Sequence, residues 1–396
     1  MIKSQFDKPV DRKGTNCLKY DFAAEFGRPE GLIPLWVADM DFCAPDQVKE
    51  TLRRCAEHGI FGYTDAKPEY YQVLGKWFLD HFGWETDPSW VVKSPGVVFA
   101  LAAAIRAFSK EGESIMIQQP VYHPFANVIK TNDRRLVVNQ LVCVDGVYRM
   151  DYDDFEKKIV EEDVKVFLLC SPHNPVGRVW TREELQRVGD ICLKHKVLVV
   201  SDEIHCDFTY PGHKHLVYAS LGQAYADNAI VCTAPSKTFN LAGLQASNIW
   251  IPNPDIREQL KNEIAKTGYS DLNTCGLAAC QAAYTYGGEW LAELKEYLKG
   301  NVDFVRSFLQ ENLPQIHLIE PQGTYLLWVD FRELGLSVEE LNEFLVEKAR
   351  LWLNDGSMFG EGGIGFQRIN IACQRETLKK AFEQLAKAIA STALHK

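Results

Sequence analysis

The sequence predicts an α/β protein with a mostly parallel sheet flanked by helices, joined to a smaller α+β domain. The chain has 396 residues, of which 46% are hydrophobic and 24% charged, so it has enough apolar material for two cores and no signature of disorder. Between residues 45 and 285, helical patterns alternate with short apolar runs rich in β-branched residues, as in sheets that helices cover on both faces. After about residue 287 this alternation stops, which indicates a different architecture.

In the first part of the chain, apolar residues recur at helical spacing in five segments. These predicted helices are 46–58, 69–82, 97–109, 152–161 and 181–194. The last one opens with Thr181 and has Glu184 three residues later. This is the pattern of a capping box, in which the hydroxyl and the carboxylate accept hydrogen bonds from otherwise unpaired backbone N–H groups.

Short apolar runs between the helices predict five strands. They are 114–118, 164–170, 197–201, 229–233 and 247–251. Their residues are apolar at consecutive positions rather than alternate ones, so both faces of each strand are expected to be buried. Strands of this kind between helices favour parallel pairing.

The last hundred residues predict one long helix, two strands and a closing helix, at 289–309, 324–330, 368–373 and 376–391. We therefore expect a large domain over residues 46–287 and a small domain made of residues 1–45 and 288–396. No repeat and no low-complexity linker marks the boundary between them.

Charge and cysteine usage exclude several classes of protein. The net charge of −10 argues against nucleic acid or an anionic membrane as the main partner. The 11 cysteines are scattered, form no C-x-x-C pair and include Cys170, Cys232 and Cys373 within apolar runs, which favours reduced, buried thiols. The N-terminus has no signal-peptide apolar core, and no apolar stretch approaches membrane-spanning length. A cytoplasmic protein is expected.

Polar residues follow three of the predicted strands where each strand ends. Asn174 follows the strand at 164–170, Asp202 follows 197–201, and Lys237 follows 229–233. Open α/β sheets bind ligands beyond the carboxyl ends of their strands. The sequence therefore predicts a crevice into which an amide, a carboxylate and an amine all point.

Lys237 is the most informative of these residues. It lies just past a buried strand, among small and hydroxyl residues, where loss of hydration lowers the pKa of an amine. A neutral amine is what a Schiff base with an aldehyde cofactor requires. On this evidence alone an ordinary loop lysine is the alternative.

Three motifs in this order carry a family resemblance. Asn174 lies in S-P-x-N-P-x-G at 171–177, Asp202 opens D-E-x-x, and Lys237 completes S-K. The chain thus resembles, over nearly its whole length, the aminotransferase-like, fold type I family of pyridoxal 5′-phosphate (PLP) enzymes. The resemblance implies PLP as cofactor, bound through Lys237. It also implies that Asp202 keeps the ring nitrogen protonated and that Asn174 donates to the phenolic oxygen.

His205 stands where aminotransferases of this family usually carry a tyrosine. It either reaches the same phenolic oxygen or merely packs beside it. The resemblance also places the cofactor phosphate on the main-chain N–H groups of Gly96, Val97 and Val98, where a glycine turn opens a predicted helix, with Ser236 adding its hydroxyl. One departure concerns Gln245, because many relatives have arginine at that position; neutral donors or another cation must then meet the phosphate charge.

Two aromatic residues match cofactor contacts in the family. Tyr122 matches the residue that stacks on the pyridine face, with a plain core tyrosine as the alternative. Tyr63 matches a tyrosine that the neighbouring subunit delivers to the phosphate. If this holds, the active site is built at the interface of a homodimer.

Arg368 is the predicted clamp for the α-carboxylate of a small-molecule amino-acid substrate, because a guanidinium fork binds a carboxylate through two hydrogen bonds. An internal salt bridge is the competing interpretation. The segments 34–42, 236–244 and 356–360 look like the MalY/PatB group of cystathionine β-lyase-type enzymes. That likeness implies backbone contacts from Val37 and Ala38 near the substrate carboxylate.

Two further patterns point to no site. Gly360–Gly365 fits G-x-G-x-x-G, but a strand is predicted after it where a dinucleotide site needs a helix. His213 and His215, with His205 and Cys206, lack the spacing of a known metal site, so no metal is expected.

The group resemblance implies a β-elimination. A PLP-dependent carbon–sulfur lyase would cleave L-cystathionine or a related cysteine S-conjugate to a thiol, pyruvate and ammonia, a reaction belonging to amino-acid metabolism and methionine biosynthesis. Two alternatives remain open from the sequence: an aminotransferase of small or aromatic amino acids on the same scaffold, and a regulatory binding protein that retains the fold.

Overall fold

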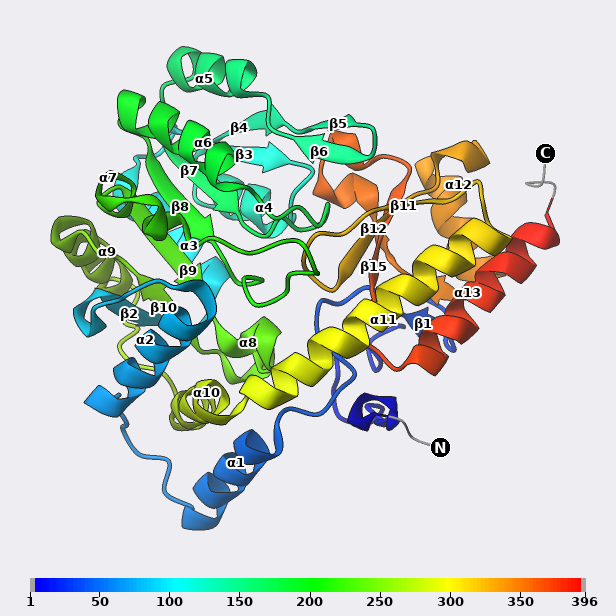
Figure 1. The fold of residues 1–396 in the computed structure, drawn as a ribbon, viewed down its shortest axis with the longest axis horizontal. Helices are drawn as coiled ribbons and strands as arrows, with labels where there is room; N and C mark the ends of the chain where they lie inside the picture. The colour runs from blue at the N-terminus through cyan, green and yellow to red at the C-terminus, as the bar shows by residue number, and fades with distance from the viewer. Residues whose placement is uncertain (1–3, 393–396) are drawn as a thin grey trace.

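A seven-stranded sheet forms the centre of the larger part of the computed structural model, which describes residues 4–392 (Figure 1). Its strand order is β2-β10-β9-β8-β7-β3-β4. The strands are β2 (Val91–Ser94), β3 (Ser114–Gln119), β4 (Arg135–Gln140), β7 (Val164–Cys170), β8 (Leu198–Asp202), β9 (Ala229–Thr233) and β10 (Ser247–Trp250). Five neighbours, from β4 to β9, are parallel, whereas β10 is antiparallel to both β9 and β2. The predicted mostly parallel sheet is confirmed.

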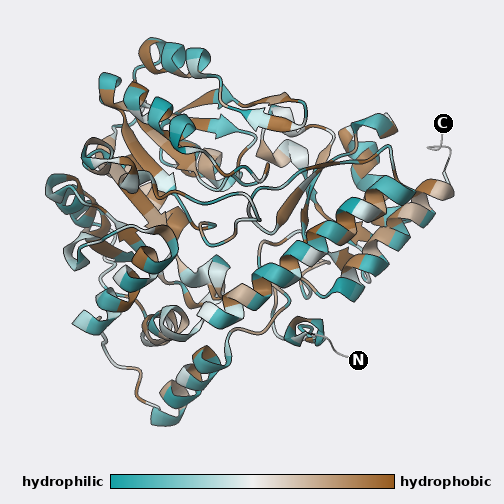
Figure 2. Cartoon of the chain, in the orientation of Figure 1, coloured by the Kyte–Doolittle hydropathy of each residue, from teal (hydrophilic) through white to brown (hydrophobic). Residues whose placement is uncertain are grey.

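Helices cover both faces of this sheet, as the continuous apolar runs predict. In β7, Leu168 packs in one core with α3 (Val97–Phe108), α4 (Pro124–Thr131) and α9 (Pro254–Ala265). Its neighbour Leu169 packs in the opposite core with α5 (Tyr152–Glu161) and α6 (Arg182–His195). Successive strand residues point to opposite faces, so each central strand needs apolar residues at every position. Figure 2 shows these strands as largely hydrophobic ribbons between helices with hydrophilic outer faces.

A second, antiparallel sheet has the order β11-β12-β15-β14. Its strands are β11 (His317–Ile319), β12 (Leu326–Asp330), β14 (Asn354–Asp355) and β15 (Phe366–Asn370). The long helix α11 (Gly288–Asn312) and α13 (Arg375–Ala390) pack together beside it (Figure 1). The short strand β1 (Ile33–Pro34) pairs in parallel with β13 (Leu351–Trp352), so the N-terminal segment joins the C-terminal part of the chain.

Short elements complete the described fold: the hairpin β5 (Val142–Val144) and β6 (Val147–Arg149), and the helices α1 (Asp46–His58), α2 (Pro68–Phe82), α7 (Gln223–Ala226), α8 (Pro235–Thr238), α10 (Thr274–Tyr286) and α12 (Val338–Glu343). The capping box of Thr181 and Glu184 forms as predicted at the start of α6. No helix among residues 4–392 is long and apolar enough to cross a membrane.

The sequence did not reveal several elements, among them β2, β4, α4, α9 and α10 and most of the short ones, and it misplaced one strand. The strand predicted at 368–373 is β15, which begins and ends earlier. Edge strands β2 and β4 are short or carry charged residues, and α4 and α9 were not assigned. Helix α10 is rich in alanine, glycine and cysteine and is buried on most of its surface, so it lacks the one-sided apolar stripe that identifies a surface helix.

All 11 cysteines are unpaired, and Cys170, Cys232 and Cys373 are buried, as the sequence indicated. The glycine-rich pattern at 360–365 leads into strand β15 rather than a helix, so the dinucleotide interpretation fails in the structure as well.

Candidate active site

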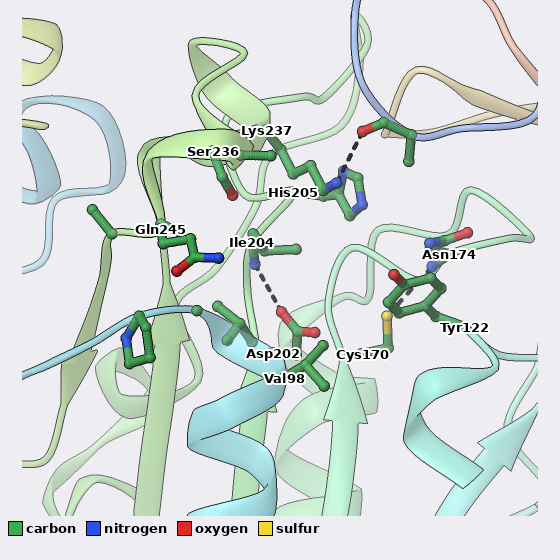
Figure 3. A pocket seen from close by; sticks show the side chains of 17 residues that line it. Val98, Tyr122, Cys170, Asn174, Asp202, Ile204, His205, Ser236, Lys237 and Gln245 are labelled. Atoms are coloured by element: carbon green, nitrogen blue, oxygen red, sulfur yellow. Dashed lines mark hydrogen bonds between the residues drawn. The ribbon is translucent and has the colours of Figure 1, made fainter. Parts of the chain in front are cut away.

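A cavity of about 170 Å³ lies beyond the carboxyl ends of β7, β8 and β9 (Figure 3). These three strands are neighbours in the sheet, so the residues that follow them meet at one edge. Asn174, Asp202 and Lys237 all line the cavity, and the predicted crevice with its amide, carboxylate and amine is confirmed. Other predicted site residues also line it: Ala38, Gly96, Val97, Val98, Tyr122, His205 and Ser236, together with Gln245.

The amine of Lys237 projects from α8 toward the N-terminal segment of the chain. Its Nζ donates a hydrogen bond to the carbonyl oxygen of Ala38 at 2.9 Å. Burial, reinforced by the positive charge of Arg368, lowers the pKa of Lys237 to about 8, against the opposing effect of the carboxylates Asp39 and Asp202. The side chain can therefore supply a neutral amine near physiological pH.

The carboxylate of Asp202 is buried at the end of β8. Burial raises the pKa of Asp202 to about 7, although the Ile204 N–H group, which donates to Oδ1 at 3.1 Å, and the charge of Lys237 both favour ionisation. Oδ2 is left for a donor within the cavity. A cationic N–H group at that position would stabilise the ionised form and would itself be held protonated.

His205 lies between the lysine and the second sheet. Its ring makes an edge contact with Tyr325 at 5.8 Å between centroids, and its Nδ1 is buried without a hydrogen-bond partner in the described part of the chain. Burial, with the positive charges of Lys237 and Arg368, holds the pKa of His205 well below its usual value. The imidazole is therefore neutral and keeps one nitrogen without a partner in these surroundings.

Asn174 and Arg368 are held by one another. Arg368 Nη1 donates to Asn174 Oδ1 at 3.1 Å, and Nη2 donates to the Trp36 carbonyl at 2.9 Å and to Asn354 Oδ1. This contact fixes the orientation of the Asn174 amide and leaves its Nδ2 free to donate. Tyr122 lies beside it, and its N–H group donates to the Asn174 carbonyl at 3.0 Å.

The guanidinium of Arg368 has no carboxylate partner within residues 4–392, so the alternative of an internal salt bridge is not found there. The side chain is only 3% exposed, and its Nε lacks an acceptor. Burial lowers the pKa of Arg368 to about 10, so it is still a cation at neutral pH. A buried cation whose partners are all neutral is suited to binding an anion.

Helix α3 points its N-terminus at the cavity. Gly96 precedes it with φ 174°, which is extended backbone rather than the glycine turn expected from the sequence, and no side chain caps the helix. A Cβ atom added to Gly96 would meet nothing within 4 Å. The uncapped N–H groups and the positive end of the helix dipole suit an anion, and Ser236 and Gln245 line the same cavity.

Three predicted residues lie outside the cavity lining. Arg368 touches it only through Asn174, and Val37 is set back from it although Ala38 lines it. Tyr63 is far more exposed than the others, at 112% of its reference area, and lies beside the exposed Ile60 and Phe61. Within one chain, Tyr63 does not reach the site.

Two residues that hold parts of the site in place, Tyr325 and Asn354, were not identified from the sequence. Tyr325 donates to the Ala38 carbonyl at 3.0 Å, and Asn354 holds Arg368. Both lie in the second sheet region, where an isolated tyrosine or asparagine carries no recognisable spacing. His215, considered for a metal, instead pairs with Glu203 at 2.7 Å, and no cluster of His, Cys, Asp and Glu among the described residues could hold a metal ion.

Comparisons with known proteins agree with this geometry. The family model for aminotransferase class I and II matches residues 31–385. Cystathionine β-lyase PatB of Bacillus subtilis is 41% identical over 97% of this chain and 99% of its own length. Protein MalY of Escherichia coli is 33% identical over 97% and 98%.

Among solved structures, cystalysin from Treponema denticola, which contains a PLP cofactor, superposes with a TM-score of 0.95 at 38% identity, covering 99% of this chain and 100% of that one. A PLP-bound putative aminotransferase from Clostridium difficile gives a TM-score of 0.95 at 43% identity over 98% and 100%. The chain therefore belongs to the class I and II aminotransferase family and, within it, to the group of cystathionine β-lyases that includes PatB and MalY.

Proposed function

We propose that this protein is a PLP-dependent carbon–sulfur lyase that converts L-cystathionine, or a related cysteine S-conjugate, to a thiol, pyruvate and ammonia by β-elimination. The observation that carries this proposal is the similarity to cystathionine β-lyase PatB over nearly the whole of both chains. The cavity supports it, because Lys237, Asp202 and the α3 N-terminus meet there.

The residues of the cavity fit PLP group by group. The amine of Lys237, with its lowered pKa, suits an aldehyde. The buried carboxylate of Asp202 suits a protonated ring nitrogen, and the free Nδ2 of Asn174 suits the phenolic oxygen. We assign the ring face to Tyr122 and a second contact near the phenolic oxygen to His205. When bound, PLP supplies an electron sink that stabilises negative charge at the substrate Cα.

The phosphate would be held by neutral donors. We assign to it the N–H groups of Gly96, Val97 and Val98 at the start of α3, with the Ser236 hydroxyl. Gln245 lines this part of the cavity, and its amide can donate hydrogen bonds to the phosphate but adds no charge. The helix dipole supplies the remaining positive potential.

The substrate α-carboxylate would be held by Arg368, whose buried guanidinium has no anionic partner within residues 4–392. The backbone N–H groups of Val37 and Ala38 find no acceptor in that range either, and we assign them to the same carboxylate. Binding there places the substrate between Arg368 and Lys237, with its Cα–H directed at the lysine amine.

Lys237 Nζ acts as the general base. Its neutral amine removes the Cα proton and becomes an ammonium, which Asp39 and Asp202 stabilise. Asp202 in its ionised form holds the ring nitrogen protonated, which keeps the electron sink at full strength. The Cβ–S bond then breaks, and the sulfur departs as a thiolate.

We further propose a homodimer in which Tyr63 of one copy completes the phosphate site of the other. The exposed Ile60, Phe61 and Tyr63 follow one another closely in the chain, and a group of neighbouring exposed apolar residues favours an interaction surface. A cytoplasmic location and a role in methionine biosynthesis, with the domain limits at residues 45 and 287, belong to the same proposal.

An aminotransferase is the second candidate, because a solved structure described as a putative aminotransferase is 43% identical to this chain. In that case Lys237 would return its proton to the cofactor side rather than allow a sulfur group to leave. A regulatory protein that retains the fold is the third possibility carried over from the sequence.

One assay separates the three. The purified protein, saturated with PLP, is mixed with L-cystathionine without any 2-oxo acid, and pyruvate, ammonia and thiol are measured together. A lyase gives all three in equal amounts. Amino-group transfer that depends on an added oxo acid, with no thiol released, supports an aminotransferase, and no turnover of either kind in the presence of a stoichiometric protein partner supports a regulator.

A further inference from the structure

Every backbone carbonyl of residues 36–42, here called the clamped segment, accepts a hydrogen bond from a side chain. Each of these carbonyls is held from elsewhere in the chain. The donors, in order along the segment, are Arg368, Asn370, Lys237 with Tyr325, Asn370, Arg12 with Asn240, Gln374 and Asn240. The segment therefore has a fixed position relative to the lysine loop and to the second sheet.

Within the clamped segment, Ala38 is the residue whose carbonyl is shared with the catalytic lysine. Lys237 Nζ donates to it at 2.9 Å and Tyr325 Oη at 3.0 Å. Only one of these two hydrogen bonds can persist when the lysine reacts. When the neutral amine joins an aldehyde as a C=N bond, both amine hydrogens leave with the aldehyde oxygen as water, so the nitrogen can no longer donate to Ala38.

Ala38 is half-buried at the cavity, and a carbonyl held away from bulk water is destabilised when it loses its donor, so a partner that stays stabilises this oxygen. Tyr325 fits this need. Its side chain is fully buried, with its ring perpendicular to Phe208 at 5.0 Å and edge-on to His205 at 5.8 Å. A ring packed in this way cannot turn its hydroxyl elsewhere without disturbing the core.

We propose that Tyr325 is a positioning residue, which holds the Ala38 carbonyl as the docking acceptor for the free amine of Lys237. An amine that donates one N–H to Ala38 has its lone pair directed away from that carbonyl, toward the cavity. Lys237 would return to this position each time the substrate amine displaces it, ready to remove the Cα proton. The proposal rests on the proposed function for its chemistry but not for its test.

The shared carbonyl also affects the proton affinity of Lys237. Two donors divide the negative charge of one oxygen, so the ammonium form of Lys237 gains less from Ala38 than it would alone. The other charged and titratable groups around Lys237 are Asp39 on the clamped segment, Asp202 at the end of β8, His205, and Arg368 on β15. None of them is changed when only the hydroxyl of Tyr325 is removed.

The test uses the full chain without cofactor, in the variant Tyr325→Phe. An isotopically coded acetylating reagent is applied over a range of pH, and the peptide containing Lys237 is quantified by mass spectrometry. The midpoint of the profile gives the pKa of the amine, and the plateau at high pH gives its accessibility. Tyr210→Phe is the control, because Tyr210 is a partly buried tyrosine whose hydroxyl oxygen is itself buried but has no partner in the described structure.

We expect the midpoint to rise by about half a pKa unit or more in Tyr325→Phe, as one hydrogen bond to the shared carbonyl is lost, with the plateau unchanged. Tyr210→Phe should match the unmodified chain. An unchanged midpoint in Tyr325→Phe, or a midpoint that rises together with the plateau because the site has opened to water, overturns the proposal. Neither outcome depends on lyase activity, so a failed lyase assay leaves this result to be judged separately.

Discussion

Replacing Asp202 by asparagine should have opposite effects on stability and on activity. Asparagine has nearly the same shape, and its oxygen can still accept the hydrogen bond from the Ile204 N–H group. The carboxylate is buried in a cavity where burial raises its pKa from the usual 3.8 to about 7. In cofactor-free protein, the negative charge of Asp202 therefore destabilises the folded state.

The size of this effect follows from linkage. The folded state holds the proton more tightly than the unfolded state, so stability falls as pH rises from about 4 to 7 and is constant above that range. At about 1.4 kcal/mol for each pKa unit, the ionised carboxylate costs about 4 kcal/mol at pH 8 and less than half of that at pH 5. The raised pKa already includes the opposing attraction of Lys237, so the expected gain at pH 8 is about 4 kcal/mol, or about 5 °C in Tm for a chain of this length.

The measurement is thermal unfolding of cofactor-free Asp202→Asn and unmodified protein at pH 5 and pH 8. Asp207→Asn is the matched control: Asp207 is also buried, but its two oxygens accept from Trp77 and Thr238, so an amide there removes the acceptor of the Thr238 hydroxyl proton and should destabilise the protein. Equal gains for Asp202→Asn at both pH values, or a lower Tm at pH 8, would refute the reasoning. With PLP bound, the same variant should lose pyruvate formation by about a hundredfold or more, because the ring nitrogen loses its counter-ion.

Three further predictions concern the proposed site. Lys237→Ala should abolish pyruvate release from L-cystathionine; turnover close to that of the unmodified enzyme would contradict the role of Lys237 as base. Arg368→Lys should lower kcat/KM by about a hundredfold, because one ammonium cannot replace a fork that also holds Asn174; steady-state kinetics with unchanged values would show that the carboxylate binds elsewhere. Tyr63→Ala and Lys237→Ala, each inactive alone, should regain about a quarter of full activity when their subunits are mixed, since half of the dimers are mixed and one of their two sites is intact. No recovery in dimers shown to have exchanged subunits would place Tyr63 outside the site.

The sequence predicted most of the fold through periodicity. Strands such as β7, β8 and β9 are apolar at every position because both faces are buried, and this pattern is visible without coordinates. The direction in which neighbouring strands pair was harder to predict from the sequence. Strand β10 is as buried as its neighbours but antiparallel to them, and nothing in four residues distinguishes the two arrangements. Helix α10 was not predicted because it is buried on most sides and lacks a one-sided apolar stripe.

Several expectations remain predictions. The domain limits at residues 45 and 287, the role of each site residue and the delivery of Tyr63 by a second subunit all await experiment. The structure locates these side chains, but their roles depend on a cofactor, a substrate and a second copy of the chain.

By itself, the sequence determined the chemistry at the strand ends: Asn174, Asp202 and Lys237 were identifiable because each follows an apolar run, and parallel strands bring such positions to one edge. Only the tertiary structure decided the pKa values and the hydrogen-bond partners of these groups. Arg368 is bound by neutral partners, Asp202 is buried, and Tyr325 shares the Ala38 carbonyl with Lys237. Some of these contacts join residues that lie hundreds of positions apart in the sequence. Contacts between such distant residues produce no recognisable motif in the sequence, because they depend on how the two sheets pack around the same short segment.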